Sequence, residues 1–145
     1  MSGKLIGQNI RIMGLKLKGS QFAAILRLAT IVINCGDKSD SMKKTEELSR
    51  VSISFGIKDE VLRQTINLSM SMKPSEIDSE IRSLGEKEKK WLSAFLGRLI
   101  DVGEKYSENE MFAWKTIREE YNLPDMEIKE ARRIISDCLK YGDFS

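Results

Sequence analysis

The amino-acid sequence predicts an all-α fold, a compact bundle of about seven helices. Apolar residues recur at helical spacing in one segment after another, and Gly, Ser, Asp or Pro separates those segments. The chain has 2 prolines in 145 residues, and its apolar and charged fractions, 41% and 32%, are typical of a charge-rich globular protein. A chain of this length can bury its own hydrophobic core as one domain.

The N-terminal residues differ from the rest of the chain. We divide the sequence into a basic N-terminal arm, residues 1–20, and a helical domain, residues 21–145. In the arm, apolar and basic residues alternate on either side of Gly14, which predicts extended structure or a small hairpin. A partly disordered arm is the alternative interpretation. The basic residues of the arm are Lys4, Arg11, Lys16 and Lys18.

Three helices are expected in the first half of the helical domain. The first has Ser20 as its N-cap and ends at Gly36, where its apolar periodicity stops. The second covers about residues 42–55, with apolar residues on one face. The third opens at Asp59 and ends before Pro74, because the residue before a proline disfavours helical geometry.

The fourth helix is expected to be short, with Ser75 as its cap and Gly85 after its end. The fifth, about residues 87–102, has the widest apolar stripe and is expected in the core. Gly97 lies within it and lowers its helix propensity, so we expect another backbone to pack closely there.

The last two helices have clear start signals. The stretch "SENE" places Ser107 at the N-cap and Glu110 three residues later, which is a capping box. Asp125 is expected to open the final helix, which ends before Gly142. The helical domain contains no alternating run that would predict a strand.

Two segments of the chain resemble each other and predict an internal repeat of helical hairpins. In each, an apolar helix runs into a glycine, an acid and a lysine: Gly36-Asp37-Lys38 and Gly103-Glu104-Lys105. A second helix follows and closes on an aromatic, a turn residue and an aliphatic residue. The distance from the glycine to that aliphatic residue is 21 residues at Ile57 and 20 residues at Leu123.

This doubled pattern resembles the TerB-like (tellurite resistance B-type) helical family over about residues 22–124. The resemblance implies an all-helical cytoplasmic module linked to stress responses, membrane-linked complexes, and phage or toxin defence. It implies no common active site. In some members of the family, acidic residues near the two turns have been linked to metal binding.

The corresponding acids of this chain define a candidate metal site. Family turns usually place Asp immediately before the glycine, but Cys35 and Val102 occupy those positions here. The polar residues stand one place earlier, which rotates a helical side chain by about 100°. The calcium-loop pattern also fails when it is started at Asp101. We therefore expect structural corners, with a metal-responsive acidic module as the alternative. The residues of that alternative are Asp37, Asp40, Asp101, Glu104 and Glu108.

Catalysis is not expected. The chain has no histidine, which removes the commonest general base and most zinc sites. No phosphate-binding glycine loop is present. No cofactor is expected apart from the divalent metal of the acidic alternative. No apolar run approaches the roughly 20 residues of a membrane-spanning helix, and Cys35 and Cys138 stand far apart, so we expect a reducing cytoplasm.

The expected function is non-catalytic protein–protein interaction through a face formed by the arm and the helical hairpins. The partner's identity and the oligomeric state are not predicted. The alternative is a nucleic-acid or anionic membrane-surface binder that uses the basic arm. A purely structural interpretation of the arm is that its apolar side packs on the bundle while its lysines stay in water. Four residues are expected in the core, with an adaptable binding groove as the alternative: Met70, Met72, Met111 and Trp114.

Overall fold

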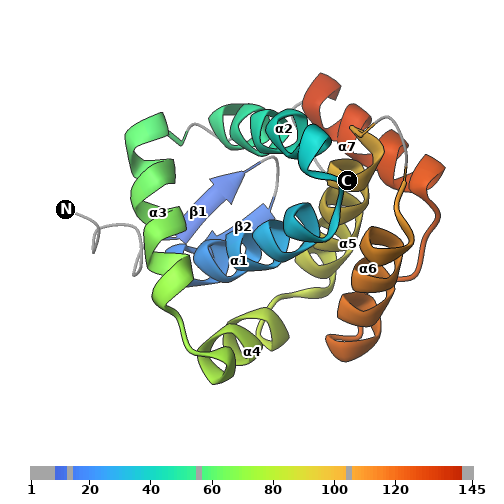
Figure 1. Ribbon diagram of the computed structural model, residues 1–145. Helices are drawn as coiled ribbons and strands as arrows, with labels where there is room; N and C mark the ends of the chain where they lie inside the picture. Colours follow the sequence, from blue (N-terminus) through green and yellow to red (C-terminus); the bar gives the residue numbers. More distant parts are fainter. Residues whose placement is uncertain (1–8, 13–14, 55–56, 104–105, 142–145) are drawn as a thin grey trace.

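The computed structural model describes residues 9–12, 15–54, 57–103 and 106–141. Within these ranges it confirms the all-α class, with seven α-helices after a two-stranded hairpin (Figure 1). None of the described helices is both long and apolar enough to cross a membrane. The elements are β1 (Asn9–Ile12), β2 (Leu15–Lys18), α1 (Gly19–Cys35), the short 3-10 helix η2 (Lys38–Asp40), α2 (Ser41–Ser54), α3 (Asp59–Ser71), α4 (Pro74–Arg82), α5 (Glu86–Asp101), α6 (Glu108–Glu120) and α7 (Ile128–Tyr141).

The described part of the arm forms the predicted hairpin. β1 and β2 are antiparallel, with Asn9 opposite Lys18 and Ile12 opposite Leu15. Leu15 and Leu17 are fully buried, whereas Lys16 between them is exposed, because successive side chains of a strand point to opposite faces. The backbone N–H of Lys16 donates to Glu88 Oε2 over 3.0 Å, which ties the hairpin to the first turn of α5.

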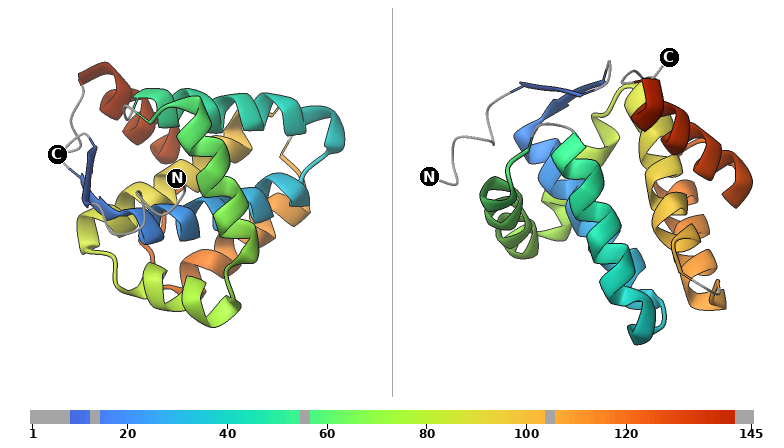
Figure 2. Two further views of the ribbon diagram at one scale, coloured as in Figure 1. Left: turned by 90° about the vertical axis from the view of Figure 1, so that its left-hand side faces the viewer. Right: turned by 90° about the horizontal axis from the view of Figure 1, so that it is seen from above.

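Helices α1 and α5 form the centre of the bundle. α1 packs against α3, α4, α5 and α6, and α5 packs against α6 and α7. Both helices bury residues around most of their circumference, which is why other helices cover them on several sides. Seen from above, α1–α4 lie on one side of the molecule and α5–α7 on the other (Figure 2).

Gly97 explains the close packing on α5. A Cβ atom at Gly97 would lie 2.6 Å from Cζ2 of Trp114 in α6 and 2.7 Å from Cβ of Ala131 in α7. The indole Nε1–H of Trp114 donates to the carbonyl oxygen of Ser93 over 3.0 Å, which fixes the ring over this glycine. A close approach is therefore present, but side chains of two helices make it in place of the expected backbone.

Two predicted N-caps are wrong. α1 begins at Gly19, before Ser20, and α4 begins at Pro74, before Ser75. In both helices the backbone N–H of the preceding lysine is bound by the side chain at the third helical position, Gln21 or Glu76. This half of the capping box works without a serine at the N-cap, and proline is favoured at the first helical position.

The other two start signals have different outcomes. The capping box at α6 is confirmed: Glu110 N–H donates to Ser107 Oγ over 3.0 Å, and Ser107 N–H donates to Glu110 Oε1 over 3.2 Å. The start of α7 at Asp125 is wrong, because that helix begins at Ile128. The carboxylate of Asp125 instead accepts a hydrogen bond from Arg118 over 2.7 Å.

Candidate functional site

The predicted repeat has two corners, each of which contains a glycine. In the structure these two corners lie against each other. The first joins α1 to α2 and contains Gly36; the second joins α5 to α6 and contains Gly103. The hydroxyl of Ser107 donates to the carbonyl oxygen of Cys35 over 3.5 Å, so the second corner touches the end of α1. Whether the two halves are true repeats stays a prediction.

A buried ion pair fills the space between the corners. Lys44 Nζ of α2 donates to Glu110 Oε2 of α6, and the two side chains are 0% and 1% exposed. The other carboxylate oxygen of Glu110 accepts the N–H of Ser107, so one side chain both caps α6 and binds Lys44. A buried pair is tolerated when further hydrogen bonds satisfy its oxygens, and Glu110 meets that condition.

Both glycines leave the room that this ion pair needs. A Cβ at Gly36 would lie 2.7 Å from Cδ of Glu110 and 2.8 Å from Nζ of Lys44. A Cβ at Gly103 would lie 2.9 Å from Oδ2 of Asp40 and 3.1 Å from Cε of Lys44. Asp40 is 8% exposed, so the corners enclose one ammonium group and two carboxylates. The glycines are needed here for space.

The acids of the candidate metal site are distributed over different environments. Asp37 is exposed, and its Oδ1 accepts the N–H of Ser39 over 3.0 Å, which lowers the pKa of Asp37. Glu108 is exposed in the first turn of α6, and Glu104 lies outside the described residues. Among the residues that the structure describes, no three Asp, Glu or Cys side chains gather closely enough to hold a metal ion.

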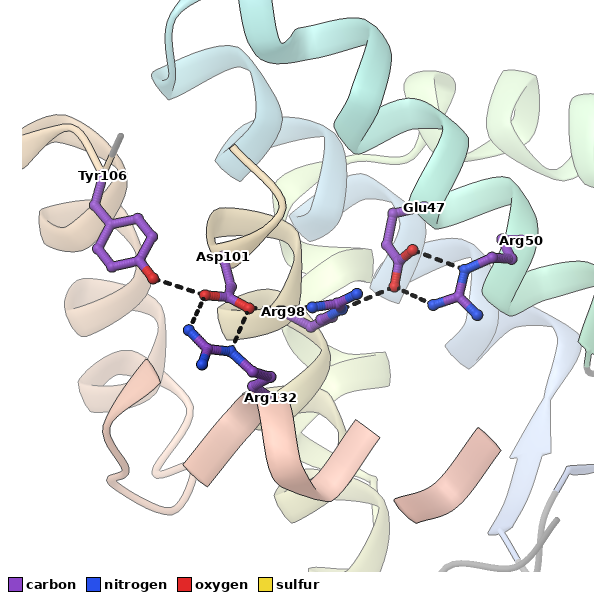
Figure 3. A network of polar contacts seen from close by, with 6 residues as sticks. All are labelled: Glu47, Arg50, Arg98, Asp101, Tyr106 and Arg132. Atoms are coloured by element: carbon purple, nitrogen blue, oxygen red, sulfur yellow. Dashed lines mark hydrogen bonds and ion pairs between the residues drawn. The ribbon is translucent and has the colours of Figure 1, made fainter. Parts of the chain in front are cut away.

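Asp101 belongs to a network of arginines that is separate from the corner pair (Figure 3). Its two carboxylate oxygens accept bonds of 2.8 and 2.7 Å from Arg132 of α7, and Arg98 and Tyr106 donate to it over 3.1 and 2.6 Å. The bonds from Arg132 lower the pKa of the Asp101 carboxyl to about 2, and Tyr106 and the charge of Arg98 add to this against the opposing effect of burial.

Arg98 extends the network to α2. Its Nε donates to Glu47 Oε2 over 3.0 Å, and Arg50 donates to both oxygens of Glu47 over 2.8 and 2.6 Å. Burial raises the pKa of Glu47, but the bonds from the two arginines outweigh that effect, so the net shift is downward. The network therefore joins α2, α5 and α7 through side chains (Figure 3).

The predicted interaction residues of the arm are only partly described. Lys16 and Lys18 are exposed on β2, on the face opposite the buried leucines. Arg11 lies in β1 at the position opposite Lys16, and Lys4 lies outside the described residues. In β2 the apolar side chains pack on the bundle and the lysines reach solvent, as the interpretation of the arm as a packed element expects.

An open groove lies between α1, α3 and α4, which we call the α1/α3/α4 groove. It has a volume of about 380 Å³ and a mostly apolar lining. In the left view of Figure 2, α3 faces the viewer and α4 lies below it. The residues that define the groove include Ala23 of α1, Leu68 of α3, Met72 after α3, and Glu76, Ser79 and Glu80 of α4.

The expected core positions divide into two groups. Trp114 is 1% exposed and belongs to the core, as predicted. Met70 and Met111 are 54% and 36% exposed, so the core expectation is wrong for both. Met72 is partly buried and lines the α1/α3/α4 groove. Helical spacing alone cannot separate these cases, because α3 and α6 each have only part of their surface covered.

Sequence reasoning missed Lys44, although two signals pointed to it. Lys44 stands four residues before Leu48 and seven before Val51, on the predicted apolar face of the second helix. Lys44 and Glu110 also each stand 13 residues before the closing aliphatic residue of their segment, Ile57 or Leu123. Together these positions identify a buried charge with a partner of opposite sign.

Comparison with known proteins supports the fold. No known protein family matches the chain, and no curated protein matches it either. The crystal structure of a protein of unknown function from Porphyromonas gingivalis W83 is similar, with a TM-score of 0.69 and 23% sequence identity. The similarity covers 83% of this chain and 90% of that one. At this level of identity it shows the fold alone.

Proposed function

We propose that this chain is a non-catalytic protein–protein interaction module of TerB-like type. The observation that carries the proposal is the α1/α3/α4 groove, which is open and mostly apolar. Concave apolar surfaces with a few polar groups are the usual form of binding sites. Met72 contributes a flexible thioether side chain that can adapt to the shape of a partner.

A protein partner fits this groove better than a small molecule does. Its volume of about 380 Å³ is near the lower end of the roughly 300–1,000 Å³ of ligand pockets. Because it is open, a small ligand would keep much of its surface in water.

The setting of this function rests on the TerB-like resemblance alone. A role in stress responses or in phage and mobile-element biology belongs to the proposal on that basis. A cytoplasmic location is also part of the proposal, and it is supported by Cys35 and Cys138, which are not joined in a disulfide.

Affinity capture from the native host tests the proposal. Ser79→Arg places a large cation in the groove at an exposed helical position, where arginine is a good helix former. Ser136→Arg makes the same change on the exposed face of α7 and serves as the control. We expect the Ser79 variant to lose partners that the wild type and the control both retain. Equal recovery with all three proteins would refute the proposal.

The metal-responsive alternative has less support. Asp101 is bound by two arginines, so positive charge already faces it, and Asp40 Oδ2 and Lys44 Nζ both border the space at Gly103, 2.9 and 3.3 Å from where its Cβ would lie. This alternative expects calcium or zinc to raise the melting temperature and a chelator to remove the gain. An unchanged melting temperature would exclude it.

A further inference from the structure

We infer that the α1/α3/α4 groove takes a partner segment in which apolar side chains are flanked by lysine or arginine. The inference rests on the proposed interaction function and adds the chemistry of the partner. Two properties of the groove carry it: the apolar surface between the helices and the carboxylates that α4 places beside that surface.

The apolar part of the groove comes from three elements. Ala23 of α1 is buried, and Leu68 and Met72 are partly covered. A partner that placed leucine- or methionine-sized side chains here would remove apolar surface from water on both sides, at roughly 25 cal/mol per Å². The small Ser79 side chain on α4 lets the partner's main chain come close to that helix.

The charged part of the groove comes from Glu76 and Glu80. These residues stand four positions apart on α4, so their side chains lie on one face of the helix. α4 carries three acidic residues and one basic residue, a net charge of −2. Among the described residues, neither glutamate forms an ion pair, and no lysine or arginine lines the groove.

Two carboxylates that form no ion pair with the described residues favour a positively charged partner. Complementary charge speeds association and excludes partners of the wrong sign. A nucleic acid or an anionic membrane would bring further negative charge to Glu76 and Glu80. A basic-apolar peptide segment satisfies both properties of the groove at once.

Peptide titration tests this chemistry directly. The probe is a short fluorescein-labelled peptide in which two leucines are flanked on both sides by lysines, and fluorescence anisotropy reports binding to the full chain. Two matched peptides replace the lysines by glutamate or the leucines by serine. We expect binding of the first peptide only, with weaker binding as the ionic strength rises from about 0.05 M to about 0.5 M.

Variants of the chain locate the charge. Glu76→Gln with Glu80→Gln keeps the hydrogen bond to Lys73 N–H, because glutamine also serves in a capping box. We expect this double variant to bind the lysine peptide roughly threefold to tenfold more weakly. The control, Glu127→Gln with Glu130→Gln, removes the same charge near the start of α7 and is expected to bind like the wild type.

The outcomes separate this inference from the function on which it rests. Equal binding of the glutamate peptide, or an unchanged affinity in the Glu76 and Glu80 double variant, would overturn the basic-apolar chemistry. If no peptide binds but Ser79→Arg still abolishes capture of host partners, the chemistry is wrong and the interaction function stands. If Ser79→Arg changes neither experiment, the groove is not the interface and both proposals fail.

Discussion

Lys44 is the residue whose environment departs most from its chemical type. A lysine is rarely fully buried unless it is paired, and here its partner is Glu110 across the contact between two corners. The pair connects α2 to α6, which are far apart in the sequence. The positions of both corners therefore depend on one buried charge pair.

Breaking this pair is expected to be costly. Lys44→Met leaves the Glu110 carboxylate buried without its cation, which costs about 3–5 kcal/mol of the free energy of unfolding. Lys44→Met with Glu110→Gln is expected to recover part of that loss, because glutamine stays uncharged and still accepts the N–H of Ser107. Urea unfolding followed by circular dichroism measures both. A single variant that loses no more than about 1 kcal/mol would contradict this account of the corner.

Asp101 predicts a specific dependence of stability on pH. Its pKa lies at about 2 in the folded chain, below the 3.8 of an ordinary aspartate, so the charged form is favoured by folding. The contribution of the Asp101 carboxylate to the free energy of unfolding is present above about pH 4 and is lost as the pH falls toward 2. Asp101→Asn is expected to cost about 1–2 kcal/mol at pH 7, since Arg132 is half exposed and its attraction is partly screened.

Thermal unfolding of wild type and Asp101→Asn between pH 7 and pH 2 checks this prediction. The difference in unfolding free energy between the two proteins should be constant down to about pH 4 and shrink below it. A difference that stays constant to pH 2 would show that the carboxylate charge is not what stabilises this network.

At the scale of elements, helices α5, α6 and α7 meet at Gly97, and this contact holds α5 in place. Alanine has a helix propensity about 1 kcal/mol better than glycine, so Gly97→Ala would stabilise an exposed helix. Here the new methyl group would meet Trp114 and Ala131. We expect a net loss of about 1–3 kcal/mol, measured by urea unfolding. Ser136→Ala on the exposed face of α7 is the control, and stabilisation by both changes would contradict the packing described for α5.

The hairpin β1–β2 provides the matching test for the basic arm. Lys16→Glu with Lys18→Glu reverses both charges at exposed positions and leaves Leu15 and Leu17 in place. We expect a change in unfolding free energy of no more than about 0.5 kcal/mol and unchanged capture of host partners. Loss of those partners, or wild-type binding to DNA or anionic vesicles that this variant abolishes, would place the interface on the arm.

Helix starts show where local sequence signals stop being sufficient. Ser107 and Glu110 form both halves of a capping box, and that helix starts where predicted. Ser20 and Ser75 look like caps by residue type, but Gln21 and Glu76 bind the backbone N–H two residues before each serine and shift the starts. In these two cases the side chain at the third helical position thus decides where the helix begins.

For the whole molecule, the sequence predicted the class and the succession of helices, because apolar periodicity is a local property, but it left open whether the arm forms a hairpin or is partly disordered. It could not predict that the corners at Gly36 and Gly103 touch, since that contact depends on how α1 and α5 cross. The groove could not be predicted from the sequence either. Ala23, Leu68 and Ser79 are unremarkable in their own helices and form a concave surface only when three elements meet.

Site-specific photo-cross-linking in the native host tests most directly whether the α1/α3/α4 groove is a protein interface. A photoreactive phenylalanine analogue replaces Ser79 in the groove or, as the control, Ser136 on α7. We predict a cross-linked protein adduct from position 79 that does not form from position 136. The same adducts from both positions, or none from position 79, would contradict the account.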